Sequence, residues 1–226
     1  MIRTTAFVHL RPDVAGATVD RLVDAVRRVD AELDALAVDA ARVTPNSVNA
    51  GDVMLLGAFA DADALERARR HPQVADAVRP LLDECARHVE VVRYEQAPVV
   101  LREPAIRDCV HRTLLLAVDP ETDPALVARF EHDLADMPRY IEAIRNSSLS
   151  RVGTVDGSRG PAYTHVWEQE FASLEGLTGP YMRHAYHWSL VDPWFDAQSP
   201  TRIVDDVLVH AACPLRRSFL ALGPVG

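Results

Sequence analysis

Apolar runs typical of strands alternate with apolar residues at helical spacing through the first half of the chain. Residues 2–10 form a β-rich run, and Arg11-Pro12 ends it because proline donates no ladder hydrogen bond. From Val19 to Val29, apolar residues then recur on one helical face. The predicted order is β-α-β-β-α-α-β, with further strands at 36–44, 53–59 and 88–95 and further helices at 61–70 and 74–85.

The same order returns after residue 106. Residues 110–118 are predicted as a strand, and Asp123-Pro124 supplies an N-cap and a first-turn proline for the helix that follows. Later segments are predicted as strands at 149–156, 163–171 and 203–211, and as a helix at 173–184. The chain therefore contains two related sets of elements.

A sheet with helices on one face must cover its other apolar face, and a second copy can do this. We therefore predict an α+β fold in which two tandem ferredoxin-like repeats form a pseudo-dimeric α+β barrel. The alternative is that each unit pairs with another chain. The predicted division is a first repeat at 1–96, a linker at 97–105, a second repeat at 106–215 and a tail at 216–226.

Composition narrows the class of protein. With 226 residues, 48% hydrophobic and 25% charged, the chain is typical of a globular protein. Its net charge of −9 disfavours nucleic acid or an anionic membrane as a partner. Three scattered cysteines and the absence of an 18-residue apolar run favour the cytoplasm. We expect a small-molecule substrate, with further homo-oligomerisation possible.

Candidate chemistry is concentrated in the second half. All three tryptophans and six of the nine histidines follow residue 100, which favours a pocket there because ligand sites combine aromatic walls with a few polar groups. The residues concerned include His111 in VHRTLLLAV, Tyr163-Thr164-His165, and the segment from Tyr181 to His187.

These motifs resemble the stress-responsive dimeric α/β-barrel (Dabb) family, once per half of the chain. In the second half the resemblance is close, except that Ala185 replaces the proline of Tyr-x-x-His-Pro-x-His. In the first half, Thr4 and Val53 stand at the positions assigned to the two strand histidines, and only His71-Pro72 remains of the later motif. This asymmetry favours one working site and one scaffold copy.

Members of this family include a plant polyketide cyclase and a plant hydroxynitrile lyase. The resemblance implies that His187 is a general base and that Tyr181 orients and polarises a carbonyl. It also implies that the substrate is bound by His111, His165, His184, Trp167 and Trp188. The inferred chemistry is proton abstraction beside the carbonyl of a polyketide-like or aryl compound, leading to aldol-type cyclisation or cleavage, with no cofactor and no metal.

Other interpretations remain open from the residues alone. A strand histidine such as His111 is often a satisfied core group, and Trp188 and Trp194 are often core residues. His184-x-x-His187 with His111 and His165 could hold a metal, and related barrels act as cofactor-independent monooxygenases or hold haem. A non-catalytic small-ligand-binding stress protein is a further class. The catalytic hypothesis requires His111, His165, Tyr181 and His187 to face one solvent-reachable cavity.

Overall fold

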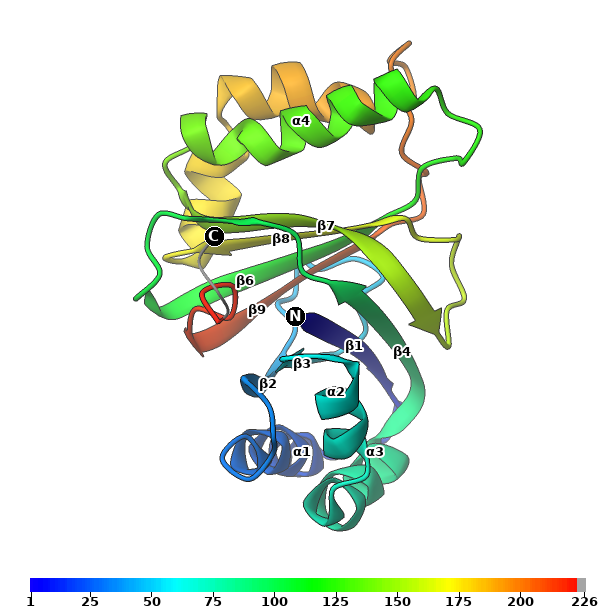
Figure 1. Cartoon of the computed structure of the whole chain (residues 1–226), viewed down its shortest axis with the longest axis vertical. Coiled ribbons are helices and arrows are strands. Elements are labelled where there is room, and N and C mark those ends of the chain that lie inside the picture. Colours follow the sequence, from blue (N-terminus) through cyan, green and yellow to red (C-terminus); the bar gives the residue numbers. More distant parts are fainter. Residues whose placement is uncertain (223–226) are drawn as a thin grey trace.

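The computed structural model describes residues 1–222, which form a nine-stranded antiparallel sheet with helices on its outer faces (Figure 1). The strands are β1 (Ile2–Leu10), β2 (Ala37–Arg42), β3 (Val53–Phe59), β4 (Ala86–Glu95), β5 (Val99–Leu101), β6 (Arg107–Leu116), β7 (Ile144–Asp156), β8 (His165–Phe171) and β9 (Val209–Arg217). The helices are α1 (Gly16–Val29), α2 (Ala62–Arg69), α3 (Arg79–Cys85), α4 (Pro124–Tyr140) and α5 (Leu174–Gly176), with short helical turns η1 (Val74–Val78), η2 (Leu177–Tyr181), η3 (His187–Val191) and η4 (Asp192–Trp194).

The two halves of the sheet have the same internal strand order. We call β1–β4 with their helices the first half, and β6–β9 with theirs the second half. The order is β2-β3-β1-β4 in one and β7-β8-β6-β9 in the other, so the first strand of each half lies between its third and fourth strands. This arrangement is that of a ferredoxin-like unit. The predicted α+β fold is confirmed.

Two seams join the halves into a nearly closed barrel. At the first seam, β4 pairs with β7 over Val91–Tyr94. At the second seam, the chain after β2 meets β9: the Thr44 amide donates to the Ala212 carbonyl at 2.7 Å, and Val48 forms an isolated bridge with His210. The second seam therefore has few backbone hydrogen bonds.

Helices cover only the outside of this barrel. In Figure 1, α1–α3 lie against the sheet of the first half and α4 lies against that of the second. The inner faces of the two sheets meet in a core that includes Phe7, Met54, Leu115 and Val166, all fully buried. Each half thus buries one sheet face under helices and the other against its partner half.

One local prediction is confirmed and two need correction. The predicted N-cap of α4 is confirmed, since the Asp123 carboxylate accepts from the Ala125 amide. The predicted helix at 173–184 is instead a series of short turns, because Pro180 cannot donate a helical hydrogen bond. The closing strand begins at Val209 rather than 203, because the Asp205 side chain accepts from the Val207 amide and forms a turn there.

The connecting and terminal segments are more ordered than their composition suggests. Within the predicted linker, β5 pairs with β7. In the predicted tail, β9 extends to Arg217, and the following residues Ser218–Leu220 are buried. Residues 223–226 of that tail lie outside the described residues. The division into repeats, linker and tail stays a prediction.

Across residues 1–222, helix length and hydropathy together give no segment capable of crossing a bilayer.

A fragment of residues 105–226 lacks the strands that cover the inner face of β6, β8 and β9. Leu115, Val166 and Cys213, which are fully buried in the whole chain, would face water. Since monomeric proteins rarely expose large contiguous apolar patches, we expect this fragment to self-associate or aggregate in size-exclusion chromatography. A soluble, monomeric fragment with native-like circular dichroism would contradict the prediction.

Candidate functional site

Strand alternation separates the predicted site residues onto two faces of the sheet. Successive side chains of a strand point to opposite faces. On β6, Leu114 belongs to the core beneath the helices, whereas Leu115 belongs to the core inside the barrel. On β8, Trp167 lies under the helices and Val166 lies inside. A predicted site residue on these two strands therefore faces either the helices or the barrel interior, depending on whether its position is odd or even.

A cavity of about 480 Å³ lies beneath the helical side of the second half. We call it the Arg112 cavity. Its walls come from β6, β8, β9, the segment between Leu177 and Phe195, and the loop after β2. The lining residues are Asn46, Val48, Arg112, Leu114, Trp167, Leu177, Thr178, Met182, His187, Val191, Asp192, Phe195, Leu208 and His210.

Arg112 is the central polar residue of this cavity. It is only 5% exposed, and its Nη1 donates to Gln169 Oε1 and to the Tyr181 hydroxyl, both at 2.6 Å. Its Nε donates to His210 Nε2 at 2.9 Å, and its guanidinium lies 5.2 Å from the Trp167 ring centre. Within residues 1–222, no carboxylate forms an ion pair with Arg112, so this buried positive charge has only neutral partners.

The donors around Arg112 are incompletely used. Within residues 1–222, Nη2 of Arg112 makes no hydrogen bond, and the buried Trp167 Nε1 and Gln169 Nε2 have no partner either. Buried polar groups are usually satisfied, so three donors of this kind near one cavity are suited to an oxygen acceptor on a ligand.

His187 lines the cavity beside this cluster. Its ring lies 4.6 Å from that of Tyr181, and its Nδ1 lies 3.2 Å from Asp192 Oδ1. Burial lowers the pKa of His187 despite the opposing effect of Asp192. His187 is therefore neutral near pH 7, and a proton on Nδ1 facing Asp192 would leave the Nε2 lone pair available as a base.

His210 is the second histidine of the cavity. Burial, followed by the charge of Arg112, lowers the pKa of His210 to about 3. Its Nε2 accepts from Arg112, so that lone pair is already engaged. His210 therefore positions the guanidinium rather than serving as a free base.

Tyr181 lies behind the cavity wall. It is fully buried, and its hydroxyl accepts from Arg112. Burial raises the pKa of Tyr181, which keeps the hydroxyl protonated at neutral pH. The predicted contact of Tyr181 with a carbonyl is thus replaced in this structure by a contact with Arg112, which lines the cavity itself.

Three other predicted site residues lie away from the cavity. The Nε2–H of His165 donates to Glu131 Oε1 on α4 at 2.9 Å. His184 is half-buried, with its Nδ1 accepting from the Tyr186 amide, and Trp188 is 58% exposed. The irregular turns at 177–194 place these side chains on different sides of the segment, where a continuous helix would have aligned His184 and Trp188.

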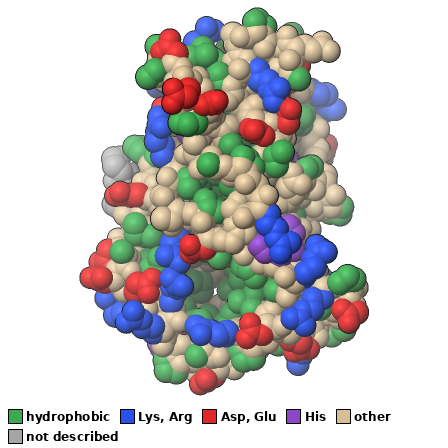
Figure 2. Space-filling model, turned by 90° about the vertical axis from the view of Figure 1, so that its right-hand side faces the viewer, with side chains coloured by type: hydrophobic (Ala, Val, Ile, Leu, Met, Phe, Trp, Pro, Cys, Tyr) green, Lys and Arg blue, Asp and Glu red, His purple; other side chains and the backbone are tan. Residues whose placement is uncertain are grey.

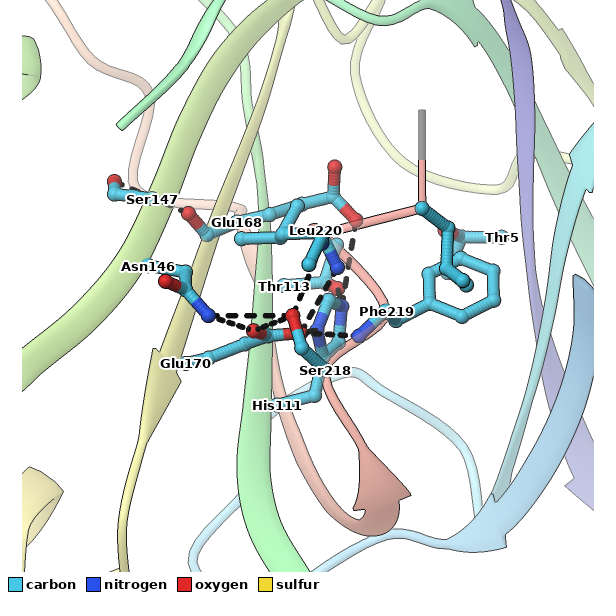
Figure 3. A network of polar contacts seen from close by, with 12 residues as sticks. Thr5, His111, Thr113, Asn146, Ser147, Glu168, Glu170, Ser218, Phe219 and Leu220 are labelled. Carbon is cyan, nitrogen blue, oxygen red and sulfur yellow. Dashed lines mark hydrogen bonds and ion pairs between the residues drawn. The ribbon is translucent and has the colours of Figure 1, made fainter. Parts of the chain in front are cut away.

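His111 points into the barrel, on the opposite face from Arg112 (Figure 3). Its Nε2 lies 3.3 Å from Glu168 Oε1, and its Nδ1 lies 3.5 Å from Glu170 Oε1. Figure 3 also shows how Glu170 binds the end of the described chain: the Phe219 and Leu220 amides donate to Oε1 at 2.6 and 3.0 Å. This network is sealed from solvent.

Opposite charges stabilise each other in this network. Burial alone would lower the pKa of His111, but hydrogen bonding to Glu168 and Glu170 outweighs it and raises that pKa to about 9. Burial alone would raise the pKa of Glu170, but its bonds to His111 and to Asn146 lower it to about 2. A buried imidazolium and carboxylate therefore coexist at neutral pH.

The expected convergence of His111, His165, Tyr181 and His187 on one cavity is therefore not observed. The cause for His111 is a one-residue difference in register. Ile2 pairs with Phe59 in the first half as Val110 pairs with Phe171 in the second. By this register the counterpart of Thr4 is Arg112, whereas His111 corresponds to Arg3, which is likewise fully buried.

Three polar residues of the cluster were not among the predicted site residues: Arg112, Gln169 and His210. The alternation of side chains along β6 and β8 places Arg112 on the same face as Trp167. The predicted site instead used the preceding residue of VHRTLLLAV, His111, because it is a histidine. The metal alternative also lacks a donor set: within the described residues, no group of three or more His, Cys, Asp or Glu side chains could hold a metal ion.

The fold is an α+β barrel built from two ferredoxin-like halves. Residues 110–209, in the second half, match the family model of the Stress responsive A/B Barrel Domain, the family that the motifs of this half resemble. No curated protein matches the chain in sequence.

Solved structures share the whole fold at low identity. A proposed monooxygenase from Fusobacterium nucleatum subsp. nucleatum has a TM-score of 0.66 and 9% identity, covering 96% of this chain and 94% of the other. A proposed monooxygenase from Lactobacillus acidophilus NCFM has a TM-score of 0.60 and 7% identity, covering 96% and 97%. An anthrone oxidase-like protein has a TM-score of 0.61 and 11% identity, covering 94% and 90%. These similarities show the fold.

The His111 network predicts how stability depends on pH. With a folded pKa of about 9 against 6.5 unfolded, His111 contributes fully below pH 6.5 and its contribution is lost as pH rises through 9. With a pKa of about 2 against 4.5, Glu170 contributes fully above pH 4.5 and loses its contribution as pH falls towards 2.

Replacing His111 by Leu leaves two buried carboxylates without their cation. We expect His111→Leu to reduce the free energy of unfolding by about 3–5 kcal/mol at neutral pH and to flatten the alkaline loss of stability. Urea unfolding at several pH values measures both. His132→Leu, at an exposed histidine, is the control, and equal effects of the two changes would argue against the network.

Proposed function

We propose that the protein is a cofactor-free enzyme that removes a proton next to the carbonyl of an aryl or polyketide-like compound, leading to aldol-type ring closure or cleavage. The observation that carries the proposal is the buried Arg112 charge, which has only neutral partners and faces a cavity that also contains a neutral histidine. Such a site is suited to an oxygen that becomes negative during a reaction.

His187 is the proposed base. Its Nε2 removes a proton from the carbon beside the carbonyl, and the electron pair moves to the carbonyl oxygen to give an enolate. In ring closure, the enolate carbon then attacks a second carbonyl, and the imidazolium returns its proton to the new alkoxide. Asp192 near Nδ1 holds the ring and stabilises the imidazolium.

Arg112 is the proposed binding group for the enolate oxygen. Nη2 of Arg112, which makes no hydrogen bond within residues 1–222, and Trp167 Nε1 are the donors available to it. Tyr181 and Gln169 position the guanidinium from behind, and His210 positions it from β9. In this proposal, Tyr181 acts through Arg112 instead of touching the substrate.

The remaining walls favour an apolar, flat compound. Leu114, Trp167, Val191, Phe195 and Leu208 surround the polar cluster, and about 480 Å³ is within the range of small-molecule pockets. The first half supplies the covering sheet and part of the wall, while the second half supplies the chemistry. Three buried free cysteines support action in the reducing cytoplasm.

Oxygen-using chemistry is a second candidate, because the solved structures that share this fold include an anthrone oxidase-like protein and two proposed monooxygenases. An enolate or phenolate formed by His187 could transfer an electron to O₂ instead of attacking a carbonyl, and both routes begin with the same proton removal. A third class, ligand binding without turnover, predicts that a bound compound is returned unchanged. Oxygen consumption and product analysis with hydroxyaryl ketones separate the three.

Proton removal can be tested before the natural substrate is known. In D₂O, the protein should exchange the α-protons of hydroxyaryl methyl ketones, followed by NMR. His187→Ala should slow this exchange at least 10²-fold, the typical loss when a general base is removed. His132→Ala is the matched control and should exchange at the unaltered rate. Equal rates for both variants would exclude His187 as the base.

Arg112 should matter through its geometry as well as its charge. Arg112→Lys retains a cation but loses the planar fork that binds Gln169, Tyr181 and His210 together, so we expect a loss of about 10²–10³-fold in kcat. Tyr181→Phe should cost less, because it removes one positioning hydroxyl. The pH profile should fall only below the ordinary histidine pKa, since that of His187 is lowered. An Arg112→Lys variant with unchanged kcat would contradict the role.

A further inference from the structure

A second cavity of about 220 Å³ lies in the first half, between the sheet and its helices. We call it the Thr4 cavity. Its walls come from β1, β2, β3, α1, α2, η1 and α3, and nearly all of its lining side chains are aliphatic. Besides Thr4, the polar side chain in the wall is Arg69.

The Thr4 cavity is the counterpart of the Arg112 cavity. In the strand register, Thr4 opposite Gly57 corresponds to Arg112 opposite Gln169, and Leu55 corresponds to Trp167. The segment 68–74 corresponds to 181–187, so Ala68 and Val74 stand for Tyr181 and His187. Thr4, Leu55, Gly57, Ala68 and Val74 all line the cavity. The space is therefore present in both halves, but with an apolar lining in the first.

A polar ligand would find no partners deep in this cavity. None of its lining residues is among the described residues with a buried, unpaired side-chain polar atom. Protein interiors are normally close-packed, and the lining atoms of an empty space lose dispersion contacts. An aliphatic chain would restore those contacts, and an apolar space of this size does not hold ordered water well.

Arg69 is the charged side chain that lines the cavity, and a second arginine, Arg70, follows it in the chain. The single carboxylate of Glu66 is shared by Arg69, at 3.0 Å, and by Arg70, at 4.0 Å. In Figure 2, the lower part of the molecule shows a hollow with hydrophobic side chains in its floor and both Arg and Asp or Glu side chains around it. The two guanidinium groups therefore have one carboxylate between them, and their side chains are 52% and 83% exposed, so an anionic head group can reach them.

We propose that the Thr4 cavity is a second ligand site, which binds the alkyl chain of a medium-chain aliphatic carboxylate with its head group at Arg69 and Arg70. This proposal is independent of the chemistry proposed for the Arg112 cavity. It assigns the first half a binding role where a comparison of polar residues alone suggests a scaffold.

Octanoate is the test probe, titrated into the full chain by isothermal calorimetry. We expect a site that Ala68→Leu weakens at least tenfold, because the added carbons occupy the cavity, while the melting temperature is maintained or raised. In the unaltered protein, nuclear Overhauser contacts from octanoate to the methyl groups of Leu55 and Val74 locate the ligand without any variant.

The control is Val191→Phe, which fills the Arg112 cavity in the same way and should leave octanoate binding unchanged. The double change Arg69→Gln and Arg70→Gln should weaken octanoate by up to about fivefold at low salt, as expected for exposed charges, and leave octanol binding unaltered. Absence of binding, contacts to other methyl groups, or loss of binding only in Val191→Phe would overturn the proposal. The proton-exchange assay with His187→Ala is unaffected by these outcomes.

Discussion

Each strand of this barrel separates neighbouring side chains by the whole thickness of the sheet, and the surroundings of both buried cations depend on that separation. His111 and Arg112 are adjacent in sequence, yet one is sealed between the two sheets and the other lies beneath the helices. The same alternation places Glu168 and Glu170 inside and Trp167 outside. A cation on each face therefore meets a different set of partners.

The two cations are balanced in opposite ways. Inside the barrel, carboxylates surround His111, and their charges hold its proton. Beneath the helices, Arg112 has amide, phenol and imidazole partners, which orient it without neutralising it. The first arrangement satisfies the charge within the protein and stabilises the fold. The second leaves the charge available to a ligand, and burial makes that interaction stronger than it would be in water.

The fold could be predicted from sequence because two periodicities repeated in the same order along the chain. The strand His165 and its neighbour Trp167 were placed on the correct face for the same reason. Placing the site also required the exact register of β6. A shift of one residue in this strand exchanges His111 for Arg112, and composition does not reveal such a shift. The turns at 177–194 could not be predicted from the sequence either, because their course depends on Pro180 and on packing against α4 rather than on helical spacing.

At the second seam of the barrel, the two halves contribute to the wall of one cavity. Asn46 and Val48 belong to the half that lacks the polar set, but they form part of the Arg112 cavity wall. Val48 is also bridged to His210, which holds the guanidinium. A substitution in the loop after β2 would therefore alter the surroundings of His210, more than a hundred positions away, so the first half does more than cover the sheet of the second.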